Sequence, residues 1–324
     1  MTAEEKTAKI GDKNKKSKVA LIGCGLIGQS WAVSFLSAGF SVSLFDPTEG
    51  VTETAKEKIK SKLKDLQNLG LIADNNISEY LEKTHLAQSL SEATQDSIYI
   101  QESGPENLEI KKKLTHEIDK VTPTNIPIAS STSGIPTSFY ANDVLGKYRC
   151  LVAHPINPPH LIPAVEVVPA PFTKGAVTQR VKEIIRSINK VPIELTKEIP
   201  GFVVNRLQGA LLAEAFELKK EGIASAEDID TAISHGLGLR WSFMGPFQTI
   251  HLNAPEGISG YVERYEQMYK EMFNNPSLDW SSVLENGLKE EILNLFDETK
   301  RENFEKQRDD KLAKLILHKR SSSR

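Results

Sequence analysis

The chain has 324 residues, a formal net charge of −3, and hydrophobic and charged fractions of 39% and 26%. This length predicts two domains with a sizeable core. The near-neutral charge gives no reason to expect nucleic acid or a membrane surface as a partner, and no apolar run approaches the ~20 residues of a membrane helix. Cys24 and Cys150 are the only cysteines and lack metal-ligand spacing, so we expect reduced thiols and no metal site.

The first 16 residues are polar and rich in lysine, and they contain no apolar segment of a secretory signal. We expect residues 1–16 to form a disordered basic arm. The last three residues, Ser-Ser-Arg, are not a peroxisomal signal. The expected compartment is therefore the cytoplasm.

A nucleotide-binding pattern follows the arm. An apolar run at residues 19–22 has the length of a buried parallel strand, and it leads into Gly23, Gly25 and Gly28 with the spacing G-x-G-x-x-G. A helical pattern and a second short strand at residues 42–45 come next. In such a unit the first glycine allows a tight turn, the second lets a pyrophosphate approach the backbone, and the third lets the helix pack close to the sheet.

Asp46 ends the second strand of this pattern and indicates which dinucleotide binds. A carboxylate at that place accepts hydrogen bonds from a ribose 2′-hydroxyl, while the N–H groups at the helix start bind the phosphates. A 2′-phosphate would meet like charge, and no Arg or Lys follows immediately. We therefore predict NAD rather than NADP. The alternative is a glycine turn that binds nothing.

Strand and helix patterns alternate through the first 195 residues, and strand patterns largely vanish after Pro200-Gly201. This predicts an α/β protein with an N-terminal Rossmann-type doubly wound sheet over residues 17–199. An all-α domain is expected over residues 200–324, ending in a charged helical tail. Within the first domain, Thr173 is expected to cap a helix.

Five lysines between residues 56 and 64 lie on a predicted helix of the first domain. Such a run is usually a solvated helix face. It could also attract a phosphorylated substrate such as a coenzyme A thioester.

Two residues on neighbouring predicted strands could perform acid–base chemistry. His154 comes just past one strand, and Glu166 lies inside the next, otherwise apolar, strand. A dehydrogenase needs a base for the alcohol proton, and a carboxylate on the other ring nitrogen would orient that base. From these residues alone, a structural histidine and an edge-strand glutamate facing water are equally supported. Glu106 and Ser133 fall in loops after strands, where ligands bind in such sheets.

Five segments, in chain order, resemble the 3-hydroxyacyl-CoA dehydrogenase family: GCGLIG with Asp46, PENLEIKKKL, SSTSG, AHPINPPHLIPAVEVVP and GFVVNRLQ. The resemblance runs from about Lys18 to past Tyr265, thins over the charged tail, and is absent from the arm.

This resemblance implies roles for individual residues. His154 would be the catalytic base and Glu166 its partner. Ser133 would contact the substrate oxygen, and Asn205 would orient the histidine and the substrate. The cofactor-contacting positions that it implies are Leu26, Ile27, Asp46, Glu106 and Lys111, beside Gly23, Gly25 and Gly28.

Four segments resemble the corresponding sequences of family members with L-gulonate 3-dehydrogenase activity: HPINPPHLIPAVEVVP, GFVVNRLQ, EGIASAEDID and GLGLRWSFMGPFQTIHLN. It implies oxidation of a free 3-hydroxy acid, L-gulonate, to 3-dehydro-L-gulonate. A free acid needs a cation for its carboxylate, and Arg240 and Arg206 are the candidates. For both arginines the alternative is a salt bridge at a helix surface or a domain interface.

Two other functions are kept open. One is the same chemistry on a 3-hydroxyacyl-CoA or on L-carnitine. The other is a bulk structural protein that retains a dinucleotide site without useful turnover. A helical second domain with apolar faces, together with the resemblance, also leads us to expect a homodimer.

Overall fold

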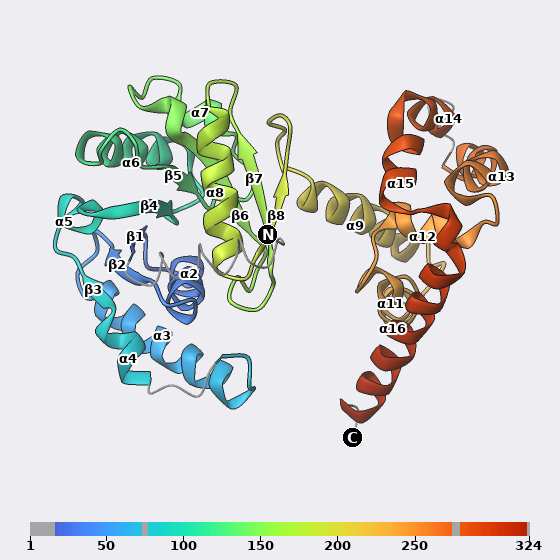
Figure 1. Ribbon diagram of the computed structural model, residues 1–324, viewed down its shortest axis with the longest axis horizontal. Coiled ribbons are helices and arrows are strands. Elements are labelled where there is room, and N and C mark those ends of the chain that lie inside the picture. Colours follow the sequence, from blue (N-terminus) through green and yellow to red (C-terminus); the bar gives the residue numbers. More distant parts are fainter. Residues whose placement is uncertain (1–16, 73–76, 274–278, 323–324) are drawn as a thin grey trace. The chain divides into compact units, whose positions relative to one another are not determined.

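The computed structural model describes residues 17–72, 77–273 and 279–322. The expected basic arm, residues 1–16, lies outside these ranges. The chain divides into two compact units between Leu211 and Leu212, and each unit is described by itself. Figure 1 shows the sheet in the first unit and helices in the second.

The first unit is built on one mixed sheet, for which the described residues supply eight strands. The strands are β1 (Lys18–Ile22), β2 (Ser41–Phe45), β3 (Thr84–Leu86), β4 (Ser97–Glu102), β5 (Ile128–Ser130), β6 (Cys150–Pro155), β7 (Ala164–Pro169) and β8 (Val191–Glu194). Their order in the sheet is β3-β2-β1-β4-β5-β6-β7-β8, and only the β6–β7 pair is antiparallel. The predicted doubly wound sheet is confirmed, because the order reverses direction at β1.

Helices flank this sheet and mostly connect successive strands (Figure 1). They are α2 (Leu26–Ser37), α3 (Val51–Asn68), α4 (Ile77–Glu82), α5 (Leu90–Thr94), α6 (Leu108–Val121), α7 (Thr137–Ala141) and α8 (Gly175–Ser187), with a 3₁₀ turn at Lys147–Arg149. Local chemistry sets where they begin: the side chain of Asn107 accepts hydrogen bonds from the N–H groups of Glu109 and Ile110 and so caps α6.

The prediction that Thr173 caps the helix now labelled α8 was wrong. The cap position is Lys174, and no side-chain bond closes the first turn. Thr173 instead donates its hydroxyl hydrogen to the carbonyl of Cys150, at 2.6 Å, and accepts the N–H of Ala170. It therefore ties the chain after β7 to the start of β6.

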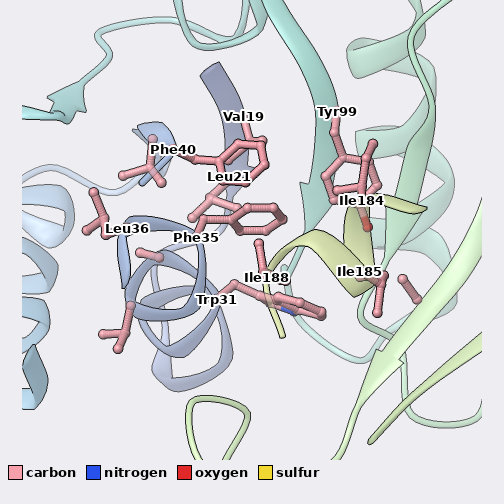
Figure 2. Close-up of a cluster of buried hydrophobic side chains, with 14 of the residues drawn as sticks. Val19, Leu21, Trp31, Phe35, Leu36, Phe40, Tyr99, Ile184, Ile185 and Ile188 are labelled. Carbon is pink, nitrogen blue, oxygen red and sulfur yellow. The ribbon is translucent and has the colours of Figure 1, made fainter. Parts of the chain in front are cut away.

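The main core lies between the sheet and α2 and α8, and Figure 2 shows the side chains that meet there. Trp31 and Phe35 of α2 are fully buried. The Phe35 ring packs against Phe40 and Tyr99, with ring centroids 5.5 and 5.9 Å apart. Large aromatic groups fix the position of α2, and with it the loop that precedes α2.

The second unit is helical, and its described residues contain no strand, as predicted. Its helices are α10 (Ala226–Thr231), α11 (Gly238–Trp241), α12 (Pro246–Asn253), α13 (Gly257–Met272), α14 (Trp280–Val283), α15 (Lys289–Leu295) and α16 (Arg301–Ser322), with π-helical turns at Ala232–Leu237 and Leu284–Leu288. Helix α9 (Val204–Lys220) crosses the boundary between the units. A small core gathers Ile258, Val262, Leu284 and Ile292.

The helical part of the second unit is interrupted twice. The chain leaves the α-helix at residues 254–256, between α12 and α13, and at residues 296–297, after which a 3₁₀ turn at Glu298–Lys300 leads into α16. None of the described helices is both long and apolar enough to cross a bilayer.

Two glycines of the G-x-G-x-x-G pattern offer a matched test of packing. A Cβ atom at Gly28 would lie 2.0 Å from the carbonyl oxygen of Gly23, whereas one at Gly25 would meet no atom within 4 Å. Gly28→Ala should lower the free energy of unfolding by about 1–3 kcal/mol, because the helix must move away from the turn. Gly25→Ala should change it by less than about 0.5 kcal/mol.

Urea denaturation of both variants beside the wild type measures this difference. Equal stability of the two variants would contradict the close packing of α2 on the glycine turn.

Candidate active site

The glycine-rich turn between β1 and α2 leaves room for a phosphate group. Gly23 has φ = +93°, a conformation that side chains disfavour, and its N–H donates to the carbonyl of Phe45 at 2.8 Å. Gly25 occupies the cap position of α2, and no side chain in the described part of the chain caps the first turn of that helix. The N–H groups of this first turn therefore remain open to an anion.

Asp46 lies beside this turn, directly after β2. Its Oδ2 accepts the N–H of Cys24 at 2.9 Å, and its Oδ1 accepts the N–H of Thr48 at 3.0 Å. Asp46, Gly23 and Gly25 line one cleft of about 660 Å³. Because each carboxylate oxygen keeps a lone pair, Asp46 can accept the hydroxyl hydrogens of a ribose, and the residues present fit a dinucleotide.

His154 and Glu166 form a buried pair across the antiparallel strands β6 and β7. The two residues are direct partners in the register, and His154 Nδ1 lies 2.7 Å from Glu166 Oε2. Their exposed fractions are 7% and 0%. His154 is the last residue but one of β6, not just past the strand as expected from the sequence, and the pairing of β6 with β7 places it directly opposite Glu166.

Glu166 has further partners at the start of α9. Its Oε1 accepts the N–H groups of Val203 and Val204 at 2.8 and 2.9 Å. Burial alone would raise the pKa of Glu166, but the hydrogen bonds from His154 and from these two amides outweigh burial and hold the pKa below its ordinary value. An ionised carboxylate only accepts, so Nδ1 of His154 carries the proton and Nε2 is left as a base.

A second cleft, of about 540 Å³, brings together residues that are far apart in the sequence. The predicted residues that line it are Ile27, Glu106, Ser133, His154 and Asn205. Glu106 Oε1 accepts the N–H and hydroxyl of Ser133 at 2.9 and 3.2 Å, and Asn205 Nδ2 donates to the carbonyl of Ser133 at 2.7 Å. The loop after β5 is thus held from two sides, with the polar groups of Ser133 and Asn205 at the cleft beside His154.

Two other predicted residues, Lys111 and Leu26, line neither cleft. Lys111 is 1% exposed, and its ammonium lies 3.0 Å from Glu102 Oε2 and 3.8 Å from Glu106 Oε2. In this position the Lys111 ammonium offsets the charges of Glu102, which bonds to the loop after β4, and of Glu106, which bonds to the loop after β5. Leu26, at the start of α2, is 57% exposed and lines neither cleft.

Neither candidate arginine has an acidic partner among the residues that the structure describes. Arg206 is exposed on α9, and Arg240 is half-buried on α11 of the second unit. The alternative for both arginines was a salt bridge at a helix surface or a domain interface. Within the described ranges, neither arginine forms a salt bridge at a helix surface.

The polar groups that support the site from β4 were not among the residues predicted from the sequence. Glu102 is 1% exposed and accepts hydrogen bonds from the backbone N–H of Gly104 and from the side chains of Lys111 and Ser130. The signal was present, because a carboxylate at the end of an apolar strand needs a partner, the same reason that drew attention to Glu166.

Most of the chain matches known proteins. The family pattern "3-hydroxyacyl-CoA dehydrogenase, NAD binding domain" matches residues 18–199, and "3-hydroxyacyl-CoA dehydrogenase, C-terminal domain" matches residues 201–292. A lambda-crystallin homolog of Rattus norvegicus is 40% identical over 253 residues, which cover 78% of this chain and 79% of the relative.

Two further relatives match over more of the chain. A 3-hydroxyacyl-CoA dehydrogenase of Gibberella moniliformis is 39% identical over 308 residues, covering 93% of this chain and 94% of the relative. An L-carnitine dehydrogenase of Oceanobacillus iheyensis is 37% identical over 310 residues, covering 92% and 97%. The three relatives are named for different substrates or for none.

The low pKa of Glu166 makes a prediction for acid stability. A carboxyl whose pKa is lower in the folded than in the unfolded state stabilises the fold above its unfolded pKa, and this contribution is lost as pH falls through the folded value. Glu166→Gln should therefore cost about 1–3 kcal/mol of unfolding free energy at pH 7. The difference from wild type should shrink as the pH falls below about 4.

Urea titrations from pH 7 to pH 3 measure this, with Glu109→Gln as a control, since Glu109 is exposed and its one ion-pair partner among the described residues is Lys112. A difference for Glu166→Gln that is constant across this range would show that Glu166 is not ionised in the folded protein.

Proposed function

The chain belongs to the 3-hydroxyacyl-CoA dehydrogenase family, whose NAD-dependent enzymes oxidise a CH–OH group, and from this premise we propose that it oxidises the 3-hydroxyl of a small 3-hydroxy acid. The acid we propose is L-gulonate, with 3-dehydro-L-gulonate as the product. The observation that carries the proposal is the buried His154–Glu166 pair, whose histidine lines the same cleft as Ser133 and Asn205.

The proton of the substrate hydroxyl would pass to Nε2 of His154. Nδ1–H points to Glu166, so the ring cannot turn away, and the imidazolium that forms lies 2.7 Å from a negative charge. NAD, when bound, supplies the acceptor for the hydride that leaves the same carbon. Gly23, Gly25, Asp46 and the start of α2 would hold it.

Asn205 and Ser133 would bind the substrate oxygens. One N–H of the Asn205 amide is used on the Ser133 carbonyl, which leaves the second for the oxygen on which charge develops. The Ser133 hydroxyl donates to Glu106, so its lone pairs can accept from a substrate hydroxyl.

The polarity of the cleft favours a hydroxylated acid. Asn157, Asn205 and Gln208 all line it, and each amide can both donate and accept hydrogen bonds. Several such groups match the hydroxyls of a sugar acid better than the methylene chain of an acyl group. Arg206 and Arg240 remain our candidates for the partner of the substrate carboxylate.

One observation favours a second substrate, a 3-hydroxyacyl-CoA. Helix α3 carries the lysine run, and only Lys60 of that run has an acidic partner among the described residues, Glu57 at 3.8 Å. The remaining positive charge could bind the phosphates of coenzyme A. A structural protein without turnover is the least supported function, because the complete His154–Glu166 pair would serve no purpose in it.

A comparison of substrates tests the proposal. We expect NADH formation at 340 nm with L-gulonate, and a kcat/KM at least tenfold above those for L-3-hydroxybutyrate, L-carnitine and 3-hydroxybutyryl-CoA, since each loses hydrogen bonds that the amides offer. A higher kcat/KM for 3-hydroxybutyryl-CoA than for L-gulonate would instead indicate a thioester substrate whose phosphates bind at the lysine run of α3. If none of the four compounds supports NADH formation while the protein still binds NADH, the proposed reaction is contradicted.

The same assay tests the carboxylate partner. Arg206→Ala or Arg240→Ala should raise the KM of the preferred acid about tenfold or more if that guanidinium binds the carboxylate. Arg264→Ala serves as the matched control, because Arg264 is paired with Glu256. An unchanged KM in a variant removes that arginine from the substrate site.

A further inference from the structure

Ser103 stands where the two clefts of the first unit meet. With Gly104 it lines both the cleft of Gly23 and Asp46 and the cleft of His154. Its N–H donates to the carbonyl of Ile22 at 2.7 Å, which fixes the loop after β4 against the end of β1. A dinucleotide that reaches from Asp46 to His154 must pass this residue.

A buried amide beneath Ser103 has a fixed orientation. Gln101 is fully buried in β4, and its Nε2 donates to the carbonyl of Ala153, at 3.2 Å, on β6. Because a backbone carbonyl only accepts, the NH₂ end of the amide must face it. The other end of the amide, Oε1, accepts a hydrogen bond from the hydroxyl of Tyr99, as this orientation requires. Tyr99 is buried in the core shown in Figure 2.

This orientation determines the hydrogen bonds of Ser131. The second N–H of Gln101 donates to Ser131 Oγ at 2.7 Å, and the indole N–H of Trp31 donates to the same oxygen at 3.1 Å. An indole nitrogen only donates, and a hydroxyl oxygen has two lone pairs. Both lone pairs of Ser131 are therefore occupied, and its own proton must be donated elsewhere.

That proton goes to Ser103. The two hydroxyl oxygens lie 2.8 Å apart, and only the direction from Ser131 to Ser103 is compatible with the donors on Ser131. Ser131 is the one hydrogen-bond partner of the Ser103 hydroxyl among the residues that the structure describes. Ser103 thus accepts from Ser131 and keeps its own proton for a group in the clefts, which its half-buried position allows.

We infer that the Ser103 hydroxyl donates a hydrogen bond to an oxygen of the nicotinamide-bearing half of the bound dinucleotide, at the junction of the two clefts. The chain from Tyr99 and Trp31 through Gln101 and Ser131 sets the direction of this donor before the cofactor arrives. Such a preset donor loses little freedom on binding. The inference rests on the cofactor of the proposed function and not on its substrate.

Ser103→Ala tests this by binding alone. NADH fluorescence titration should give a dissociation constant about fivefold to tenfold above wild type, the effect of one hydrogen bond. AMP, which has the adenosine half of the cofactor and lacks the nicotinamide half, should bind the variant within twofold of wild type. Ser187→Ala is the matched control, since the Ser187 hydroxyl bonds within α8 and lines neither cleft.

Each other outcome overturns the inference. NADH affinity within twofold of wild type would mean that Ser103 donates nothing to the cofactor. Equal weakening of NADH and AMP would mean that the substitution disturbs the glycine turn. A changed KM of the acid substrate with unchanged NADH affinity would assign the donor to the substrate. Because the NADH and AMP titrations need no turnover, a failure of the proposed reaction leaves these two measurements intact.

Discussion

The carboxylate of Glu166 is the group on which the site depends. It is fully buried, and an unpaired charge there would cost several kcal/mol. The structure offsets this cost by using both oxygens: one accepts from His154, and the other accepts from Val203 and Val204. A single charge therefore orients the base on β6 and fixes the first turn of α9, the helix that carries Asn205.

The sheet order explains why the remaining groups converge. Strands β1, β4, β5 and β6 are neighbours and parallel, so the loops that follow them open at the same edge. The loop after β1 holds the glycine turn, that after β4 holds Ser103 and Glu106, and that after β5 holds Ser133. Buried charges, Glu102 with Lys111, and the polar chain through Gln101 keep these loops in place.

Much of this arrangement followed from the sequence because it depends on local patterns. The spacing of the glycines and the alternation of strand and helix patterns predicted the doubly wound sheet. They also predicted that Gly28 allows close packing of the helix and that Asp46 follows the second strand. The pairing of His154 with Glu166 was only one of two interpretations, since register between strands is a property of the folded sheet. The resemblance to a family supplied Ser133 and Asn205, which look ordinary in isolation.

Other features depended on tertiary contacts that no pattern records. Thr173 looked like a helix cap, but its hydroxyl found a carbonyl on β6. The role of Ser103 depends on two donors to Ser131, Trp31 of α2 and Gln101 of β4, which lie 72 and 2 positions from Ser103 in the sequence. This role follows only when the proton of each hydrogen bond in the series is assigned to its donor. Lys111, one of the expected cofactor contacts, lies under the loop after β4, where the buried carboxylate of Glu102 needs a cationic partner.

The most direct test of the account is the turnover of His154→Ala with NAD and the preferred hydroxy acid, measured together with NADH affinity. The account predicts a fall in kcat by a factor of about 10²–10⁴, with the dissociation constant of NADH within twofold of wild type. His116→Ala, which removes an imidazole from α6 outside both clefts, should match wild type. Near-normal turnover of His154→Ala would show that another group takes the proton and would contradict the central claim.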